Sequence, residues 1–278
     1  MTGRPMASIA RTLGIGRSSA YREGISRAAR YARRDDAMVA AQIRSVIRTR
    51  ASYGARRVRA LVNREYETTY TRKRIQRVLE LNGWTLPRST RRRTGRAHTG
   101  RIRRAVSNER WCSDGLEIAC WNGEIVQVAF ALDCHDREVL AVIGVPRTLA
   151  GRDIQLLMQR AIAVRFGAGQ RPDAPIQWLS DNGSMYTALD TLCTAERLNL
   201  VPITTPAASP QSNGMSEAFV NTLRRDYLAG ADRASAAVIL DQLTGWIADY
   251  NGVAPHSALG YQSPQQYRAA QGALGPMD

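Results

Sequence analysis

The chain has 278 residues, of which 44 % are hydrophobic, so it is long enough for one large domain or two modest ones with an ordinary core. It contains no apolar run of membrane-helix length and no signal-peptide pattern, which excludes a membrane protein and predicts a cytoplasmic one. The 4 cysteines and 3 histidines show no metal-binding spacing, so neither a zinc finger nor a disulfide framework is indicated.

The net charge of +15 is unevenly distributed along the chain. Residues 1–110 hold 28 of the 39 basic residues but 7 of the 24 acidic ones, a net charge of +21, whereas residues 111–278 carry a net charge of −6. A basic first part joined to a mildly acidic second part suggests that one part holds a polyanion and the other acts on it.

Residues 1–34 are predicted to form a helix-turn-helix-like segment. The stretch MASIARTLGIGRSSAYREG (6–24) has helical apolar spacing, a break at Gly14 and a restart after it. The small Ala10, four residues before that glycine, suits the close crossing of two helices. A structural helical hairpin without DNA contact is the alternative.

Residues 35–85 are predicted to be a helical DNA-binding module. Three periodic apolar faces are expected, made by Met38, Ile43, Val46 and Ile47, then by Val58, Leu61 and Val62, and then by Ile75, Val78 and Leu79. The basic residues off these faces are Arg56, Arg57, Arg59, Arg72, Lys73, Arg74 and Arg77. They could form a solvated surface only, but few acids are near to pair with them, so we expect phosphate binding.

The segment 86–110 lacks apolar periodicity and is rich in arginine, including Arg91, Arg92 and Arg93. It is predicted to be a linker that orders on nucleic acid when phosphates neutralise its charge.

From residue 111 the pattern changes to the alternation of β-strands. Three strands with turns at 121–123 and 134–136 predict an antiparallel meander. The following expected elements are a helix at 152–167, a strand at 175–181, a helix near 188–198, a strand at 200–205, a Pro-rich loop at 206–214 and a long helix from Ser216. This order predicts an α/β fold with a ribonuclease H-like mixed sheet flanked by helices, placed at 111–230 and followed by a C-terminal helix and tail at 231–278.

Three acids occupy notable positions in this second part. Asp181 follows an apolar strand, where a turn-capping role is the alternative. Glu217 lies in the first turn of the long helix, where compensation of the helix dipole is the alternative. Asp114 lies within the first strand between apolar neighbours, where an unpaired carboxylate facing a core would be costly.

Adjacent strands of such a sheet can bring Asp114 and Asp181 side by side, and the long helix can lay Glu217 over both. Three carboxylates repel one another unless a cation neutralises them, and hard oxygen ligands select Mg²⁺ or Mn²⁺. Two such ions can activate a nucleophile and stabilise the leaving oxygen in phosphodiester transfer. The competing acids Asp133 and Asp136 fall in the turn DCHDRE, where a turn role is expected.

The Glu217 helix carries two further candidate residues. Asn221 and Arg224 follow Glu217 at +4 and +7, so the amide and the guanidinium share its face. We expect both side chains to contact DNA near the scissile phosphate.

The motifs WCSDG, LSDNGSMY, SPQSNGMSEAFVNTLRRDY and YNGVAPHSALGYQSPQQY resemble those of insertion-sequence transposases of the IS-three family, OrfB type, closest to its IS-two branch. The resemblance implies a retroviral-integrase-like core with an Asp-Asp-35-Glu triad, here Asp114, Asp181 and Glu217, with 35 residues between the last two. It also implies that the helical module before the core binds DNA. His256 matches a family motif in the tail, where packing or a DNA contact is expected rather than acid-base work.

The expected activity is Mg²⁺-dependent strand cleavage at element ends by water, then joining by attack of the 3′-OH on another phosphodiester. The expected partners are terminal inverted repeats and target DNA, further copies of the chain on DNA, and an upstream-frame product of the same element, since no leucine zipper is present here. The expected location is the bacterial nucleoid. The alternatives are a ribonuclease H-like nuclease that does not join strands and a non-catalytic DNA-binding regulator derived from a transposase.

Overall fold

The computed structural model describes residues 6–12, 14, 33–87, 105–204 and 214–273. These residues form two compact units, one made of helices and one built on a β-sheet. The loop Arg50–Tyr53 belongs to the sheet-containing unit, although its neighbours in sequence belong to the helical one. No helix within the described ranges is long and apolar enough to cross a membrane.

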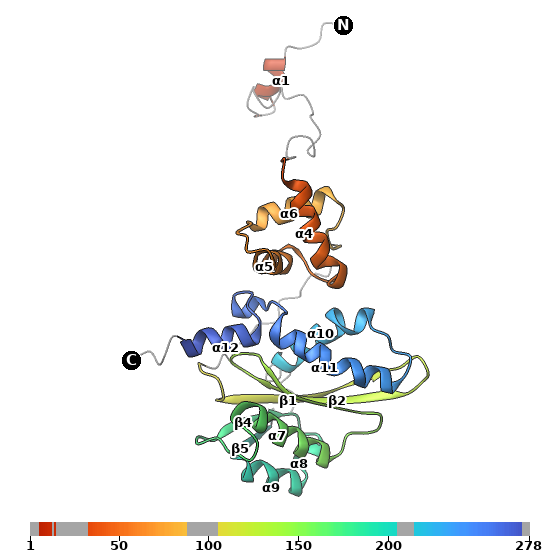
Figure 1. Cartoon of the computed structure of the whole chain (residues 1–278), viewed down its shortest axis with the longest axis vertical. Coiled ribbons are helices and arrows are strands. Elements are labelled where there is room, and N and C mark those ends of the chain that lie inside the picture. The colour runs from red at the N-terminus through yellow and green to blue at the C-terminus, as the bar shows by residue number, and fades with distance from the viewer. Residues whose placement is uncertain (1–5, 13, 15–32, 88–104, 205–213, 274–278) are drawn as a thin grey trace. The chain divides into compact units, whose positions relative to one another are not determined.

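The helical unit contains α1 (Met6–Thr12), α4 (Asp36–Thr49), α5 (Ala55–Glu65) and α6 (Arg72–Leu81) (Figure 1). The buried faces predicted for α5 and α6 are confirmed. The first turn of α6 is capped by Thr71, whose side-chain oxygen accepts a hydrogen bond from the backbone N–H of Arg74 at 3.3 Å. Of the predicted helix-turn-helix segment, residues 15–24 lie outside the described residues.

The face predicted for α4 is wrong at its start. Met38 is 53 % exposed, whereas Val39 is fully buried together with Ile43 and Val46. Positions 39, 43 and 46 follow one another at +4 and +3, which places them on a single stripe of the helix, and residue 38 lies about 100° away from it. Met38 was assigned to the buried face because it is apolar, but its position on the helix places it outside that face.

The sheet-containing unit has five strands in the order β3-β2-β1-β4-β5. The first three, β1 (Arg110–Ala119), β2 (Ile125–Asp133) and β3 (Val139–Val145), form the predicted antiparallel meander. β4 (Ile176–Ser180) pairs in parallel with β1, and β5 (Leu200–Thr204) pairs in parallel with β4. This mixed sheet and its strand order confirm the ribonuclease H-like fold.

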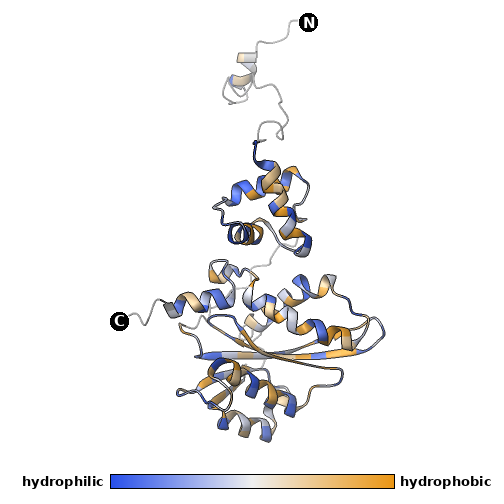
Figure 2. Ribbon diagram, viewed as in Figure 1, coloured by the Kyte–Doolittle hydropathy of each residue, from blue (hydrophilic) through white to orange (hydrophobic). Residues whose placement is uncertain are grey.

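Helices cover both faces of the sheet (Figure 1). One face packs against α7 (Gly151–Phe166), the short α8 (Ser184–Thr187) and α9 (Leu189–Arg197), around the edge-to-face pair Trp111 and Trp178. The other packs against α10 (Gly214–Asp226) and α11 (Ala236–Gly252), where Phe219 lies between Phe130 and Tyr250. Figure 2 shows hydrophilic and hydrophobic residues on each of these helices, as expected for helices with one face on a core.

The chain after α10 completes this unit with η1 (Leu228–Gly230), η2 (Ser257–Leu259) and α12 (Pro264–Ala273) around α11. The side chain of Asn251 at the end of α11 accepts from the backbone N–H of Val139 at 2.9 Å and donates to its carbonyl oxygen at 2.8 Å. This pairing fixes the end of α11 against the start of β3. The helix α12 was not predicted from the sequence, because it has little apolar periodicity.

Candidate active site

Asp114 lies in β1, and Asp181 directly follows β4, the parallel strand next to it. The register pairs Cys112 of β1 with Leu179 of β4, so the two acids come soon after a paired position on each chain segment. Side chains alternate between the two faces of a strand, and Cys112 belongs to the core under α10 and α11. Asp114, two residues further along β1, therefore lies on the α10 side of the sheet, and Asp181 lies just beyond the end of the neighbouring strand.

Glu217 lies on the helix that covers this same face. Phe219 and Leu223 of α10 are buried against the sheet, whereas Glu217 is exposed in the first turn. Asn221 and Arg224 are exposed too, in line with the face predicted for them. The described part of α10 begins at Gly214, two residues before the start expected at Ser216.

Both other candidate acids affect the electrostatic environment of Asp114. Burial raises the pKa of the Asp114 carboxyl above its usual value, and the charges of Asp181 and Glu217 raise it further. A hydrogen bond from the backbone N–H of Gly115, at 2.8 Å, acts in the opposite direction. The ionised form of Asp114 is thus destabilised by desolvation and by like charges, two effects that a bound cation would reverse.

The turn after β4 orients Asp181. Its Oδ1 accepts a hydrogen bond from the backbone N–H of Gly183 at 3.0 Å. A Cβ atom added at Gly183 would lie 3.0 Å from that same oxygen, so a larger residue would push the carboxylate aside. The turn residue of the SDNG motif therefore holds the acid in place as well as ending the strand.

A buried contact below the carboxylates was not predicted from the sequence. The Tyr186 hydroxyl of α8 lies 2.9 Å from the hydroxyl of Ser113, and both side chains are buried. Burial raises the pKa of Tyr186, so its hydroxyl stays neutral. Ser113 and Tyr186 tie the strand that carries Asp114 to the helix that follows Asp181. The only local signal was a tyrosine five residues after Asp181.

The chemical type of the three candidate ligands suits a hard divalent cation. All three candidate ligands are carboxylates, whose oxygens Mg²⁺ and Mn²⁺ prefer. Within the part of the chain that the structure describes, no three His, Cys, Asp or Glu side chains converge closely enough to hold a metal ion. Like charges keep apart when no cation lies between them, so the three carboxylates would have to move closer together to share an ion.

Asp133 and Asp136 have structural roles in the turn between β2 and β3. Asp133 is fully buried and accepts hydrogen bonds from the backbone N–H groups of Asn108 and His135, both at 2.7 Å. Asp136 is ion-paired at 2.8 Å with Arg165, a side chain that is 2 % exposed. The turn role expected for these acids is confirmed, although their complete burial was not foreseen.

The basic candidates of the helical unit differ in how much of their charge is already paired. Arg74 forms an ion pair with Asp35, and Arg77 forms one with Asp36. Arg56, Arg72 and Lys73 are exposed, and Arg57 is half-buried. The candidates Arg91, Arg92 and Arg93 lie outside the described residues. The expectation that few acids were near was incomplete, because Asp35, just before α4, and Asp36, its first residue, pair with two of these arginines.

Comparison with known proteins points to one family. Two family models described as "Integrase core domain" match residues 104–210 and 200–264. A protein of insertion element IS136 from Agrobacterium fabrum is 50 % identical over 187 residues, which cover 67 % of this chain and 95 % of that protein. "Transposase InsD for insertion element IS2D" from Escherichia coli K12 is 40 % identical over 249 residues, which cover 88 % of this chain and 82 % of that protein.

Among solved structures, the catalytic core domain of BIV integrase aligns with a TM-score of 0.42 and 19 % identity, covering 60 % of this chain and 98 % of that one.

Proposed function

The chain belongs to the family of insertion-element transposases with an integrase core domain, and from this premise we propose that Asp114, Asp181 and Glu217 are its catalytic acids. In this proposal the protein cleaves a DNA strand at the ends of its element and joins the freed 3′-OH to target DNA. The metal would be a pair of Mg²⁺ or Mn²⁺ ions held by the three carboxylates. These ions supply Lewis-acid activation of the attacking oxygen and stabilisation of the leaving oxygen.

The observation that supports the proposal is the position of the three acids around the α10 side of the sheet. The proposal is supported by three positions: Asp114 lies on the side of β1 that α10 covers, Asp181 directly follows the neighbouring strand β4, and α10 carries Glu217. The pKa of Asp114 is raised by burial and by the charges of both other acids. A carboxyl group whose pKa is raised in this way is a common mark of a functional site.

The surrounding residues orient this array. The backbone N–H of Gly183 holds the Asp181 carboxylate, and that of Gly115 holds Asp114. The buried contact between Ser113 and Tyr186 keeps the two acid-bearing segments together from the opposite face of the sheet. Rigid support of this kind lowers the cost of arranging charged groups for reaction.

We assign DNA positioning to Asn221 and Arg224, which are exposed on the Glu217 side of α10. The basic residues that we propose for DNA binding are Arg56, Arg57, Arg72 and Lys73 of the helical unit and Arg91, Arg92 and Arg93, which lie outside the described residues. Its targets would be the phosphates of the terminal inverted repeats. Further proposed partners are target DNA, other copies of this chain and an upstream-frame product of the same element, all at the bacterial nucleoid.

The test is the substitution Asp181→Asn in the full chain. It keeps the size of the side chain and an oxygen acceptor for Gly183 but removes the charge that a cation needs. Strand cleavage and joining should both fall by a factor on the order of 10³ or more, because several kcal/mol of electrostatic stabilisation are lost. Binding to a labelled duplex that carries the element's terminal repeat should be unchanged, and the rise in melting temperature caused by Mn²⁺ should shrink.

The matched control is Asp173→Asn, which makes the same chemical change at an exposed position before the same strand. It should leave cleavage, joining and the Mn²⁺ effect at wild-type values. Near-normal strand transfer by Asp181→Asn in Mg²⁺ would contradict the triad assignment. Wild-type products that are all shorter than the substrate would favour a nuclease without joining, and absence of Mg²⁺-dependent cleavage would favour a DNA-binding regulator.

A further inference from the structure

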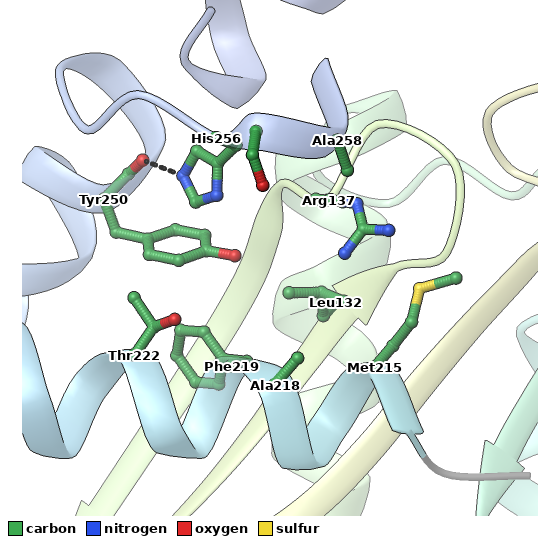
Figure 3. A pocket seen from close by; sticks show the side chains of 10 residues that line it. Leu132, Arg137, Met215, Ala218, Phe219, Thr222, Tyr250, His256 and Ala258 are labelled. Atoms are coloured by element: carbon green, nitrogen blue, oxygen red, sulfur yellow. Dashed lines mark hydrogen bonds between the residues drawn. The ribbon is translucent and has the colours of Figure 1, made fainter. Parts of the chain in front are cut away.

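A pocket of about 150 Å³ lies on the flank of α10, between that helix, the turn joining β2 to β3, and the chain after α11 (Figure 3). Its floor is apolar and closed, because Leu132, Phe219 and Tyr250 are each at most 3 % exposed. Its more accessible lining includes the polar side chains of Arg137, Thr222, His256 and Ser257, together with Met215, Ala218 and Ala258. The pocket thus offers hydrogen-bond donors and a positive charge above an apolar base.

Arg137 is the source of the charge. Figure 3 shows its guanidinium turned into the pocket, above Leu132. Within the described residues it forms no ion pair, although the acids beside it in sequence do. Asp136 is paired with Arg165, and Glu138 is paired with Arg268. Both acids adjacent to Arg137 in sequence are thus paired with other arginines, and the Arg137 guanidinium is turned into the pocket.

The backbone holds Arg137 in a costly conformation. Its φ angle is 62°, in the left-handed region that an arginine rarely adopts. The hydrogen bonds from Arg137 N to Asp133 O, at 3.0 Å, and from Glu138 N to Asp136 Oδ1, at 2.9 Å, fix the turn around it. Strain retained at one residue of a tightly bonded turn fits a side chain that is held for binding.

His256 forms part of the wall of the pocket. Its ring contacts the Tyr250 ring edge-on, with centroids 4.5 Å apart, and its Nε2 lies 3.4 Å from the Tyr250 carbonyl oxygen. That contact fixes the ring at the mouth of the pocket (Figure 3). The Thr222 and Ser257 hydroxyls lie on the lining as well, so the tail motif PHSALGY and α10 supply groups to one cavity.

We propose that this pocket binds a phosphate group of a nucleic-acid backbone, with Arg137 as its cation and the Thr222 and Ser257 hydroxyls as neutral hydrogen-bond donors. A guanidinium with several N–H donors matches the oxygens of a phosphodiester. The small volume and buried aromatic rings leave no open ring face for a base to stack on. The site rests on the proposed function, because it takes a further phosphate of the DNA engaged at Asp114.

The position on α10 suits that role. Thr222 follows Asn221 directly, about 100° round the helix, so the pocket flanks the face that carries Glu217 and Arg224. An α-helix with its side chains is about 10–12 Å across, which two or three nucleotides of a strand can span. A strand that meets the carboxylates can therefore place another of its phosphates beside Arg137.

The experiment measures binding of the full chain to a fluorescent duplex that carries the element's terminal repeat, from 50 to 200 mM NaCl. Arg137→Gly removes the guanidinium and suits the positive φ, so its melting temperature should stay near that of the wild type. Its affinity should fall about tenfold at low salt, and the slope of log K against log salt should decrease by about 1, the value for one lost phosphate contact. In cleavage assays KM should rise while kcat is retained.

The charge-matched control is Arg171→Gln, at an exposed position in the loop before β4. It should keep the wild-type affinity and salt slope. The proposal is overturned if Arg137→Gly binds with wild-type affinity and slope, or if Arg171→Gln loses as much. DNA binding is measured separately from cleavage, so this result does not depend on the Asp181→Asn test. If the triad assignment is wrong, the Arg137 binding comparison can still be interpreted. If the phosphate site is wrong, the Asp181→Asn result can still be interpreted.

Discussion

Two groups of acidic side chains in the sheet-containing unit differ in how their charge is balanced. Asp133, Asp136 and Glu138 are buried in the β2–β3 turn and surround the guanidinium of Arg165, which is 2 % exposed. In that group burial and the charge of Asp136 raise the pKa of Asp133, and the charge of Arg165 lowers it. The pKa of Asp114, by contrast, is raised by burial and by the charges of Asp181 and Glu217, an effect that a bound cation would oppose. Burial of an acid alone therefore does not distinguish the two groups, because the charges around each acid also matter.

The largest effect that tests this comparison is expected for Arg165→Met. The substitution keeps much of the side-chain volume but leaves Asp136, 2.8 Å from the lost guanidinium, buried without its partner. Removing one member of a buried ion pair costs about 3–5 kcal/mol. Chemical unfolding should show a loss of this size. The control is Arg160→Met, at an exposed position on the same helix, for which unfolding should be nearly unchanged. An equal loss of unfolding free energy in both variants would show that the ion pairs of Arg165 do not stabilise the fold.

A smaller loss is expected for Asp133→Asn. The two carboxylate oxygens of Asp133 accept from the backbone N–H groups of Asn108, His135 and Asp136 and from the indole of Trp111. An amide offers one acceptor oxygen and turns its NH₂ group towards some of these donors, at a cost of about 1–3 kcal/mol. The melting temperature should fall, while strand transfer per folded molecule stays near the wild-type value. Loss of strand transfer at full stability would instead move Asp133 into the catalytic group.

Asp153 at the start of α7 is an intermediate case, since its partner Arg147 is 41 % exposed. The Arg147 hydrogen bond lowers the pKa of Asp153 below its ordinary value of 3.8. The stabilisation is therefore present above pH 3.8 and is lost as the pH falls through the lowered pKa. Asp153→Asn should cost about 1 kcal/mol or less at neutral pH, because water screens the pair, and should flatten the acid limb of the stability curve. A variant curve parallel to the wild-type curve would contradict this.

The smallest effect has the opposite sign. Asp114→Asn removes a carboxylate whose ionised form is disfavoured by burial and by Asp181 and Glu217. The metal-free variant should melt at the wild-type temperature or slightly above it, and Mn²⁺ should stabilise it less than the wild type. Differential scanning fluorimetry with and without Mn²⁺ measures both quantities. A clear drop in melting temperature without metal would place Asp114 in the same class as Asp133.

Several features of the fold could be predicted because they depend on local periodicity. The buried faces of α5 and α6, the antiparallel meander and the order of elements along the chain came from apolar spacing and turn residues. Asp114 and Asp181 could be expected on one face for the same reason, since alternation along a strand fixes the side on which each residue lies. Their role in catalysis stays a prediction.

Other features depend on contacts between distant segments, which local spacing does not encode. The ion pairs of Arg74 and Arg77 with Asp35 and Asp36 reduce the basic surface expected of the helical unit. In the same way, nothing near Asp133 in sequence indicates Arg165, which lies 32 positions further along. Such pairs form where two helices, or a helix and a turn, happen to meet.

By itself, the sequence of this protein determined the order of its elements and the spacing of three acids, because periods of 2.0 and 3.6 residues are properties of the local backbone. The tertiary structure alone decided which charges are balanced and which remain for a ligand. Two examples are the ion pair between Asp136 and Arg165 and the position of Arg137 on the lining of the same pocket as His256. Both follow from the way in which α7, α10 and α11 pack on the sheet. Charge balance depends on distances between residues that are far apart in sequence, and those distances are set only when the helices have packed on the sheet.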